Sequence, residues 1–372
     1  MSTPTGPDRI DQVVHILAAR DAIGTHVIHT RAALRQAGYQ SEIYAGDAHP
    51  EVRDLARPLE DLSASRPGRR WLLFHHSTGS SVAEAVLRQP EPKLLDYHNV
   101  TPASYVSRWA PHMREELELG REQLAALAPA SFYGIAHSSF SQTELEAAGC
   151  THTTVVPPLF ELGDGDVDPA VAAQLASERA SGGADWLFVG RLSPHKAQHD
   201  LVKALACYRL CYDPRARLHL VGTSLGADYP RALERFAARL GISDALHMPG
   251  TVSDRALTAY YRAADVFVSA SDHEGFCVPL VEAMHLGVPV VAYGSSAVGD
   301  TVGDGGIVLT DKAPMTLAAA AHRVVADPDS KAALVRLGRR RAATFSLPLG
   351  RARMAGAIAE AVAAGRGLGV AS

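Results

Sequence analysis

Short runs of apolar residues alternate along this chain with longer stretches whose apolar positions recur at helical spacing. Residues 13–17 form the first apolar run, and a loop that contains Gly24 leads into a helical pattern over residues 26–36. Gly38 ends that helix, and a second apolar run begins at residue 42. Because glycine is favoured just after a helix and buried strands are short and apolar, this part of the chain predicts a β-α-β unit.

The same alternation continues along the rest of the chain. Further strands are predicted at residues 71–74, 93–97, 134–136, 154–156, 186–189, 217–221, 246–248, 266–269, 288–292 and 306–309. Further helices are predicted at residues 114–128, 199–211, 229–240, 255–262, 279–285 and 316–326. Strands that are apolar on both faces are typical of parallel sheets covered by helices, so the pattern indicates an α/β protein.

A proline pair at residues 157–158 and a Gly- and Asp-rich run at residues 163–168 interrupt this alternation. Such a composition is typical of a connection between domains, and we interpret Asp164-Gly165-Asp166 within it as a turn. We therefore expect two tandem Rossmann-like, doubly wound domains over residues 1–160 and 161–345. Because ligands of open α/β sheets bind beyond the carboxyl ends of the strands, the two domains are expected to face a shared cleft.

Composition and charge exclude several classes of function. The 372 residues carry a formal net charge of -4, so they lack the basic field of a nucleic-acid-binding protein. The four cysteines are interpreted as reduced thiols rather than a disulfide framework. Residues 1–11 contain no secretory apolar segment, and no apolar run approaches the ~18 residues of a membrane span. We expect a cytoplasmic protein without an integral membrane segment.

The segment over residues 271–284 lies between two predicted strands and carries the clearest chemical signal. Pro279 suits the first turn of a helix, where its missing N–H has no cost. The backbone N–H groups before it therefore lie at a helix N-terminus, which is a ready binding site for a phosphate. The residues expected to form this site are Gly275, Phe276, Cys277 and Val278.

Two carboxylates flank the predicted phosphate site. Glu274 precedes it, and Glu282 lies about one turn into the helix that follows. Because carboxylates repel an anion but accept hydrogen bonds strongly, their expected targets are sugar hydroxyls. The alternative for Glu274 is a favourable interaction with the helix dipole, and the alternative for Glu282 is a solvated helix face.

The spacing Glu-x7-Glu, with Gly-Phe after the first glutamate and Pro-Leu before the second, resembles the signature of family 4 retaining glycosyltransferases of the GT-B fold, also called glycosyl transferases group 1. Residues 188–196 resemble the first strand and loop of that family's donor domain. The resemblance implies that Arg191 and Lys196 bind the donor diphosphate. Two fixed cations suit this role, because a departing nucleoside diphosphate gains negative charge. The alternative is a solvated basic loop.

Two segments of the first half extend the resemblance. Gly24 and Thr25 fall where the family places a glycine-rich loop near the donor phosphates, with Gly24 permitting close approach and Thr25 lending an N–H. The alternative for this pair is the structural start of a helix. Residues 96–102 resemble a His-Asn-x-Thr-Pro segment, in which His98 would bind the donor sugar; the alternative is a satisfied buried histidine. Residues 75–79, which begin with His75-His76, are predicted to line the acceptor side.

Two segments of the second half belong to the same resemblance. Val252 lies where related enzymes hold the donor base through backbone groups, and the alternative is a plain strand-to-helix turn. The helical pattern from residue 345 to about residue 364 resembles the C-terminal helix that crosses back to the N-terminal domain in the GT-B fold. Residues 346–372 are therefore expected to form this crossover helix and a tail. Three arginines at residues 339–341 are interpreted as a solvated helix face, because a lipid-binding cluster needs more charges.

The resemblance implies a hexosyltransferase-type enzyme that moves a sugar from a UDP- or GDP-sugar to a hydroxyl acceptor in glycan, glycolipid or natural-product biosynthesis, with retention of configuration. The expected catalytic residues are His98, Arg191, Lys196 and Glu274. No metal ion and no cofactor is expected, because the two cations and the helix N-terminus already supply positive potential for the leaving group. The acceptor and the oligomeric state are left open.

Several alternatives use the same kind of fold. They are a nucleotide-sugar epimerase, a sugar phosphorylase and a non-catalytic partner subunit, the last of which would be expected to have lost one of Arg191, Lys196, Glu274 or Glu282. A dinucleotide-dependent dehydrogenase would need Gly-x-Gly-x-x-Gly after its first strand. No strand–helix junction predicted here carries that motif.

Overall fold

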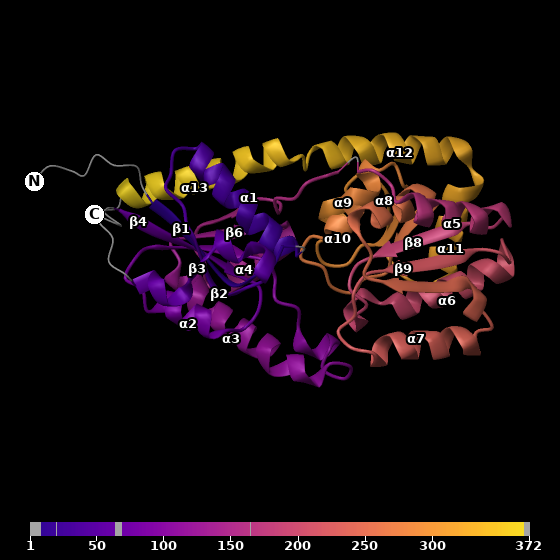
Figure 1. Ribbon diagram of the computed structural model, residues 1–372, viewed down its shortest axis with the longest axis horizontal. Helices are drawn as coiled ribbons and strands as arrows, with labels where there is room; N and C mark the ends of the chain where they lie inside the picture. The colour runs from indigo at the N-terminus through magenta and orange to yellow at the C-terminus, as the bar shows by residue number, and fades with distance from the viewer. Residues whose placement is uncertain (1–8, 20, 64–68, 164, 368–372) are drawn as a thin grey trace, which may run out of the picture. The chain divides into compact units, whose positions relative to one another are not determined.

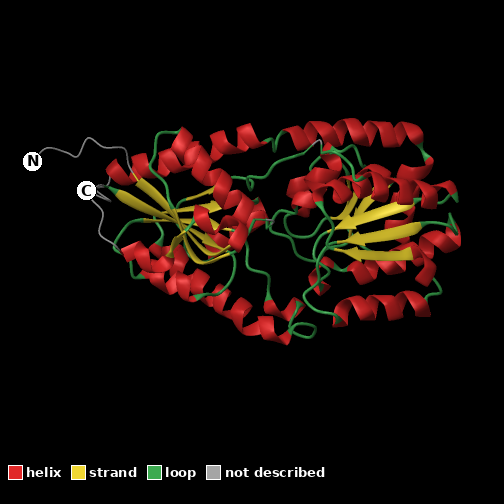
Figure 2. Cartoon of the chain, in the orientation of Figure 1, coloured by secondary structure: helices red, strands yellow, loops and turns green. Residues whose placement is uncertain are grey.

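The computed structural model describes residues 9–19, 21–63, 69–163 and 165–367. These residues divide into two compact units, each with a parallel sheet and helices on both of its faces (Figures 1 and 2). Unit 1 takes its described residues from 1–103, 113–161 and 345–372. Unit 2 consists of residues 104–112 and the described residues of 162–344. The predicted α/β class with two doubly wound sheets is confirmed.

Unit 1 contains a seven-stranded sheet with the order β3-β2-β1-β4-β5-β6-β7, and all of these neighbours pair in parallel. Its strands are β1 (Arg9–Leu17), β2 (Ile43–Ala48), β3 (Arg57–Pro58), β4 (Arg70–His76), β5 (Lys93–Tyr97), β6 (Tyr133–Ala136) and β7 (Thr153–Val155). Its α-helices are α1 (Ala22–Gln36), α2 (Ser81–Leu87), α3 (Arg114–Ala130), α4 (Ser139–Ala147) and α13 (Leu347–Gly367).

Helix α13 supplies part of the core of unit 1. Its Met354, Ile358 and Val362 lie in one hydrophobic cluster with Trp71 of β4 and Leu94 of β5. These side chains are spaced at three to four residues, so they form one apolar stripe along the helix. The predicted return of the C-terminal helix to the N-terminal unit is therefore confirmed.

Unit 2 contains a six-stranded sheet with the order β10-β9-β8-β11-β12-β13, again with parallel neighbours. Its strands are β8 (Asp185–Val189), β9 (Arg217–Val221), β10 (Leu246–Gly250), β11 (Val266–Ser269), β12 (Val290–Tyr293) and β13 (Ile307–Leu309). Its α-helices are α5 (Pro169–Ala180), α6 (Gln198–Cys211), α7 (Asp228–Arg239), α8 (Asp254–Ala263), α9 (Val278–His285), α10 (Val298–Val302), α11 (Pro314–Ala326) and α12 (Pro328–Ala343).

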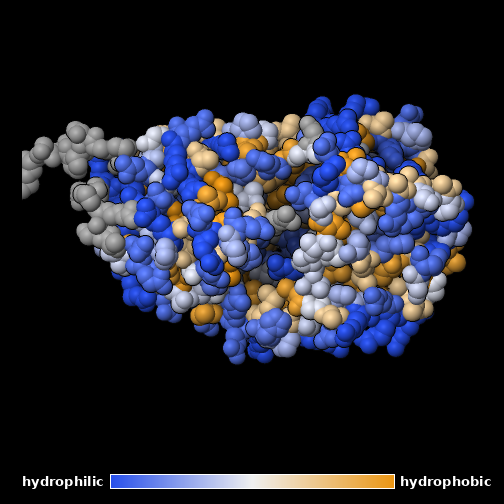
Figure 3. Space-filling view, viewed as in Figure 1, coloured by the Kyte–Doolittle hydropathy of each residue, from blue (hydrophilic) through white to orange (hydrophobic). Residues whose placement is uncertain are grey.

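Burial explains why the strands read as continuous apolar runs. Strands β5, β9 and β11 are buried along their whole length, because helices cover both faces of each sheet. On the face of the molecule seen in Figure 3, apolar residues are scattered among hydrophilic ones. The large apolar side chains gather instead in the cores of the two units.

The strand order reverses once in each sheet, which marks where a ligand is expected. Sheet order runs from β1 outward to β2 and β3 on one side and to β4 on the other, so the reversal lies between β1 and β4. In unit 2 it lies between β8 and β11. In open α/β sheets a crevice forms at this point, beyond the carboxyl ends of the strands. The residues after β8 and β11 are therefore the first place to look for a site in unit 2.

One segment of the N-terminal half belongs to unit 2, which the sequence did not predict. Residues 104–112 lie between β5 and α3 along the chain, yet they pack within unit 2. Trp109 packs against the core of unit 2, and its ring centroid lies 5.3 Å from that of Tyr229 on α7. The expected limits at residues 160 and 345 did not include this excursion.

Candidate functional site

The loops that follow β8 and β11 lie together at the switch point of unit 2. The two strands are neighbours in the sheet, and Trp186 of β8 is in register with Val266 of β11. Beyond the strands the backbone N–H of Asp272 donates to the carbonyl oxygen of His195 at 2.7 Å. The structure therefore brings together the two sequence segments that were predicted to bind the donor.

Lys196 and Glu274 form the central contact of this site. The Lys196 Nζ lies 2.5 Å from Oε2 of Glu274, and the two side chains are 19% and 5% exposed. The backbone of Glu274 is also held, because its N–H donates to Ser296 Oγ at 2.8 Å and its carbonyl oxygen accepts from Ala297 N–H at 3.3 Å. This pair lies in a protected place where its attraction is screened less than at the surface. Ser296 lies on the loop after β12 and was not found in the sequence, which gives no signal for it.

Arg191 lies on the same loop as Lys196 but reaches solvent. The residue is exposed, and its backbone carbonyl accepts a hydrogen bond from Gln198 Nε2 at 3.0 Å, which ties the loop to α6. Within the described part of the chain, no ion pair is recorded for its guanidinium. The loop therefore carries one cation held by an ion pair, Lys196, and one exposed cation, Arg191.

The neighbouring His195 is neutral. Burial, together with the nearby cations Lys196 and Arg191 and the nearby His273, holds the pKa of this imidazole well below its usual range. Its Nδ1 lies 2.9 Å from Ser193 Oγ. The positive charge of this loop therefore comes from Arg191 and Lys196 alone.

The predicted phosphate site lies where expected, directly before α9. Helix α9 begins at Val278, one residue earlier than predicted, with Pro279 in its first turn. Cys277 adopts a left-handed conformation with φ of 75°, which is uncommon for a residue other than glycine. Burial raises the pKa of the Cys277 thiol well above its usual range, and the charge of Glu274 adds to that effect. The thiol is therefore protonated at neutral pH.

Glu282 is held inside unit 2. Its Oε2 accepts a hydrogen bond from the Tyr261 hydroxyl of α8 at 2.7 Å. Burial raises the pKa of Glu282, the Tyr261 hydrogen bond opposes this shift, and the charge of Asp254 adds to it. Glu282 is half-buried, and its hydrogen bond from Tyr261 connects this side of α9 to α8. Tyr261 was not predicted as a site residue, since only the fold brings it to Glu282.

Val252 is placed in the turn between β10 and α8. It is half-buried, and the next residue, Ser253, caps α8 by accepting the Ala256 N–H on its Oγ at 3.2 Å. Strand β10 lies at the edge of the sheet, two strands from β8. A strand-to-helix turn therefore accounts for the local sequence.

Gly24 and Thr25 of unit 1 lie at the start of a helix, which is the alternative named for this pair. Helix α1 begins at Ala22, so both residues lie in its first turn rather than in a loop. The Asp21 carboxylate accepts the N–H of Gly24 at 3.3 Å, and the Asp21 carbonyl accepts the N–H of Thr25 at 3.0 Å. Neither N–H is available to a phosphate. A Cβ atom at Gly24 would lie 1.9 Å from the Ala18 oxygen, so glycine is needed there for the helix to pack on the end of β1.

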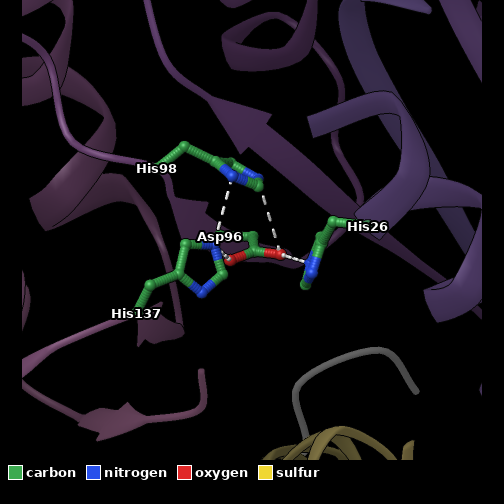
Figure 4. A group of neighbouring side chains, drawn as sticks. All are labelled: His26, Asp96, His98 and His137. Atoms are coloured by element: carbon green, nitrogen blue, oxygen red, sulfur yellow. Dashed lines mark hydrogen bonds and ion pairs between the residues drawn. The ribbon is translucent and has the colours of Figure 1, made fainter. Parts of the chain in front are cut away.

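His98 belongs to a buried cluster of histidines around Asp96 in unit 1 (Figure 4). Its side chain is only 5% exposed. The Nδ1 atom lies 3.1 Å from His137 Nε2, and the Nε2 atom lies 3.1 Å from His75 Nδ1. Both ring nitrogens of His98 thus lie next to other histidine side chains of unit 1.

The same cluster includes a residue that was predicted to line the acceptor side. His75 is buried, and its Nε2 lies 2.9 Å from Oε1 of the Gln12 side-chain amide. Its neighbour His76 points to a different place, because its Nε2 lies 2.8 Å from the Gly120 oxygen. Burial lowers the pKa of His76 to about 4. Neither imidazole is presented to solvent, so this structure does not place them on an accessible surface.

Asp96, His26 and His137 complete the cluster and were not predicted as site residues. They come from β5, from α1 and from the end of β6, and only the sheet order brings them together. Burial lowers the pKa of His26 and of His137. Burial opposes the ionisation of Asp96, but the nearby His137 and His26 outweigh it and hold the pKa of this carboxyl well below its usual range.

Part of this chain is similar in sequence to known protein families and to individual known proteins. Residues 176–341 match the sequence model of the family described as Glycosyl transferases group 1. A D-inositol 3-phosphate glycosyltransferase of Geodermatophilus obscurus is 35% identical over 216 residues, which are 56% of this chain and 48% of that protein. One from Thermobispora bispora is 29% identical over 252 residues, which are 66% of this chain and 59% of that protein. The chain spans about half the length of the curated relatives it matches.

Solved structures with a similar fold cover nearly the whole chain. Sucrose-phosphate synthase from Thermosynechococcus elongatus has a TM-score of 0.75 at 20% identity and covers 96% of this chain and 100% of its own. The Anabaena protein Alr3699/HepE in complex with UDP-glucose has a TM-score of 0.70 at 19% identity and covers 95% of this chain and 99% of its own. These likenesses confirm the predicted GT-B fold.

Proposed function

We propose that this chain, whose residues 176–341 match glycosyl transferases group 1, is a glycosyltransferase that moves a sugar from a nucleoside diphosphate donor to a hydroxyl group of an acceptor. The observation that carries this proposal is the Lys196–Glu274 pair, 2.5 Å apart at the switch point of unit 2. Lys196 and Arg191 offer positive charge to a diphosphate, and Glu274 offers an acceptor for a sugar hydroxyl. Helix α9 begins just after Glu274, so its N-terminus adds positive potential to the same loop.

The arrangement suits the departure of a nucleoside diphosphate. As the bond between the anomeric carbon and the phosphate oxygen breaks, the oxygen keeps the electron pair and the diphosphate gains negative charge. Arg191 and Lys196 stabilise that charge in the transition state more than in the ground state, which is the condition for lowering the barrier. The acceptor oxygen then bonds to the anomeric carbon, and its proton passes to the departing phosphate. We propose retention of configuration for this transfer.

Glu282 has a positioning and binding role in this proposal. The Tyr261 hydroxyl holds its Oε2 at 2.7 Å, which leaves the other carboxylate oxygen to accept from a hydroxyl of the donor. The phosphate contacts are proposed for the backbone of Gly275 to Val278. A base contact through the backbone near Val252 remains part of the proposal.

The relatives suggest which substrates to test first. The names of the related glycosyltransferases make D-inositol 3-phosphate the first acceptor to test, and the UDP-glucose complex of Alr3699/HepE makes UDP-glucose the first donor to test. GDP-sugars are the second donor class, and other hydroxyl acceptors of glycans, glycolipids or natural products follow. Transfer without a metal ion and a cytoplasmic location remain predictions. Among the described residues, no helix is both long and apolar enough to cross a membrane.

The test is a donor panel with matched variants. The full chain is incubated with UDP-, GDP- and ADP-sugars without added metal ion, and binding is measured by thermal shift and slow hydrolysis by nucleotide release. We expect a response to one donor that is lost in Arg191→Ala and in Glu282→Ala. Arg235→Ala removes an exposed arginine of α7 instead and is expected to keep the response. A donor response that is unchanged in Arg191→Ala and in Glu282→Ala would show that the donor does not bind at these loops of unit 2.

The remaining outcomes separate the alternative enzymes on this fold. Conversion of the donor to another nucleotide sugar without an acceptor would indicate an epimerase. Turnover that requires inorganic phosphate in place of an acceptor would indicate a phosphorylase. No response to any donor would support a non-catalytic partner subunit.

A further inference from the structure

The histidine–aspartate cluster of unit 1 brings buried nitrogen and oxygen atoms that are able to bind a metal ion close to one another. The cluster comprises His26, His75, Asp96, His98 and His137, and Figure 4 shows three of these histidines around the Asp96 carboxylate. Candidate ligand atoms of His26, Asp96, His98 and His137 all lie within 4.8 Å of one another. The contacts of each ring decide which atoms are able to act as ligands.

The tautomer of His137 is set by the backbone. Its Nδ1 lies 2.8 Å from the carbonyl oxygen of Val156, so Nδ1 carries the proton and donates. In a neutral ring the other nitrogen, Nε2, then carries a lone pair. This Nε2 lies 3.3 Å from Asp96 Oδ1 and 3.1 Å from His98 Nδ1.

The tautomer of His26 makes it a support and not a ligand. Its Nδ1 accepts the Leu159 N–H at 2.8 Å, so the proton lies on Nε2. That Nε2 donates to Asp96 Oδ2 at 2.8 Å, which satisfies one carboxylate oxygen and fixes the plane of the group. The other oxygen, Oδ1, is buried and has no hydrogen-bond donor among the described residues. A buried carboxylate oxygen without a hydrogen-bond donor lowers the stability of the fold, so a positively charged partner at Oδ1 would be stabilising.

His98 is connected to the cluster through its contact with His75. His75 Nε2 lies 2.9 Å from Gln12 Oε1, and His75 Nδ1 lies 3.1 Å from Asp96 Oδ2. His98 Nε2 lies 3.1 Å from the same His75 Nδ1, so the other nitrogen of the His98 ring lies on the side of His137. His98 Nδ1 and His137 Nε2 are 3.1 Å apart, and His137 Nε2 is 3.3 Å from Asp96 Oδ1.

We propose that Asp96 Oδ1, His98 Nδ1 and His137 Nε2 bind a divalent first-row transition metal ion, with Zn²⁺ as the first candidate. Tetrahedral ligand atoms about 2.0–2.1 Å from zinc lie roughly 3.3 Å from one another. The distances of 3.1 Å between the two histidine nitrogens and 3.3 Å between His137 Nε2 and Asp96 Oδ1 agree with this separation. Imidazole nitrogen with one carboxylate oxygen is a ligand set that suits zinc and its neighbours in the first row.

The supporting contacts are those that metal sites use. A ligating histidine usually donates its second ring N–H to a carbonyl or another fixed acceptor, and His137 does so to Val156. The second ring nitrogen of His98 lies 3.1 Å from His75 Nδ1. His26 holds the non-ligating oxygen of Asp96 in the same way. The ion would tie the ends of β5 and β6 together, so His98 has a structural role in this proposal. The inference does not rest on the proposed transfer reaction, because none of these residues belongs to unit 2.

The experiment measures metal in the untagged full-length protein. The purified chain is analysed by inductively coupled plasma mass spectrometry, and metal-depleted protein is titrated with Co²⁺ while visible absorption is recorded. We expect about one metal ion per chain and the intense d–d absorption of a four-coordinate cobalt site. His137→Ala and Asp96→Asn are expected to lose both signals.

Two histidine variants serve as controls. His76→Asn removes another buried imidazole of unit 1, and His247→Ala disrupts the Glu178–His219–His247 group of unit 2, which is the other place where described side chains come close enough to hold an ion. Both are expected to keep metal and the cobalt spectrum. Loss of metal in His247→Ala with retention in His137→Ala would overturn the proposal.

The wild-type titration decides the question even if the ligand variants fail to fold. Wild-type protein without metal, and without a cobalt spectrum after titration, would show that the cluster shares a proton between His137 and Asp96 instead. Donor binding is measured separately by thermal shift with a nucleotide sugar. Loss of metal binding with an intact donor response would overturn this inference alone, and the reverse would overturn the proposed function alone.

Discussion

The ammonium group of Lys196 and the carboxylate of Glu274 lie 2.5 Å apart although 78 positions separate them in the sequence. Glu274 is 5% exposed, so removal of Lys196 would leave a nearly buried charge without its partner. We expect Lys196→Met to lower the free energy of unfolding by roughly 1–3 kcal/mol, measured by urea denaturation. The double variant Lys196→Met/Glu274→Gln should lose less, because the buried charge is gone.

Lys203 provides the control for this pair. Its Nζ lies 2.7 Å from Asp200 Oδ1, but the lysine side chain is 40% exposed, and Asp200 keeps Lys312 as a second partner at 2.8 Å. Lys203→Met is therefore expected to change the free energy of unfolding by less than about 1 kcal/mol. A double variant at Lys196 and Glu274 that is no more stable than Lys196→Met would contradict the importance of the buried charge.

Glu282 predicts a pH-dependent difference in stability. Burial raises its pKa in the folded protein above the ordinary value of 4.5, so the folded state holds this proton to a higher pH than the unfolded chain. The stability that comes from the protonated group is thus present below about pH 4.5 and is lost as the pH rises through the folded pKa. Glu282→Gln has no carboxyl to ionise at this position, so it keeps the stability that wild type loses as the pH rises. The difference in free energy of unfolding, variant minus wild type, should therefore increase with pH from 4.5 upward.

The measurement for Glu282 is urea denaturation of both proteins between pH 4 and pH 8. Glu234→Gln, at an exposed position of α7, is the matched control and should follow the wild-type pH dependence. Parallel pH curves for wild type and Glu282→Gln would show that the carboxyl is not strained by burial. We expect Glu282→Gln to bind the donor more weakly while being no less stable at neutral pH.

Gly24 predicts a packing effect in unit 1. A Cβ atom there would lie 1.9 Å from the oxygen of Ala18, so Gly24→Ala forces α1 away from the end of β1. We expect a loss of roughly 1–3 kcal/mol in the free energy of unfolding. Gly356→Ala is the control, because nothing lies within 4 Å of a Cβ atom at that position of α13. Alanine there should stabilise the protein by up to about 1 kcal/mol, and equal effects of the two changes would contradict the close packing.

Trp109 predicts that residues 104–112 stabilise unit 2. Its ring packs on the core of that unit and lies 5.3 Å from Tyr229. Trp109→Ala should lower the stability of unit 2 by roughly 1–3 kcal/mol, because the ring is half-buried. Hydrogen exchange should become faster in α7 and remain unchanged in β1, and Ser104→Ala should have neither effect. Faster exchange in β1 with unchanged exchange in α7 would assign the segment to unit 1.

The sequence by itself determined the fold class and most of the elements. Strands β5, β9 and β11 begin and end at the predicted residues, because each is buried on both faces and reads as one apolar run. The start of α1 was predicted four residues late, although Asp21 is a good N-cap residue, because Gly24 was interpreted as part of a loop. The two loops proposed to bind the donor were predicted from the sequence because each is one continuous segment that follows a predicted strand. Each segment is shorter than a single β-α unit, so its residues are neighbours along the chain.

Only the tertiary structure decided the contacts that join distant segments. The sequence placed Lys196 and Glu274 in the same predicted domain but not against each other, and it gave no reason to connect Ser296 or Tyr261 with either glutamate. The cluster around Asp96 draws its side chains from α1, β4, β5 and the end of β6. The order of the parallel strands in the sheet decides which strand ends are neighbours. Crossover helices separate those ends by tens of residues along the chain, so local sequence patterns do not predict these contacts.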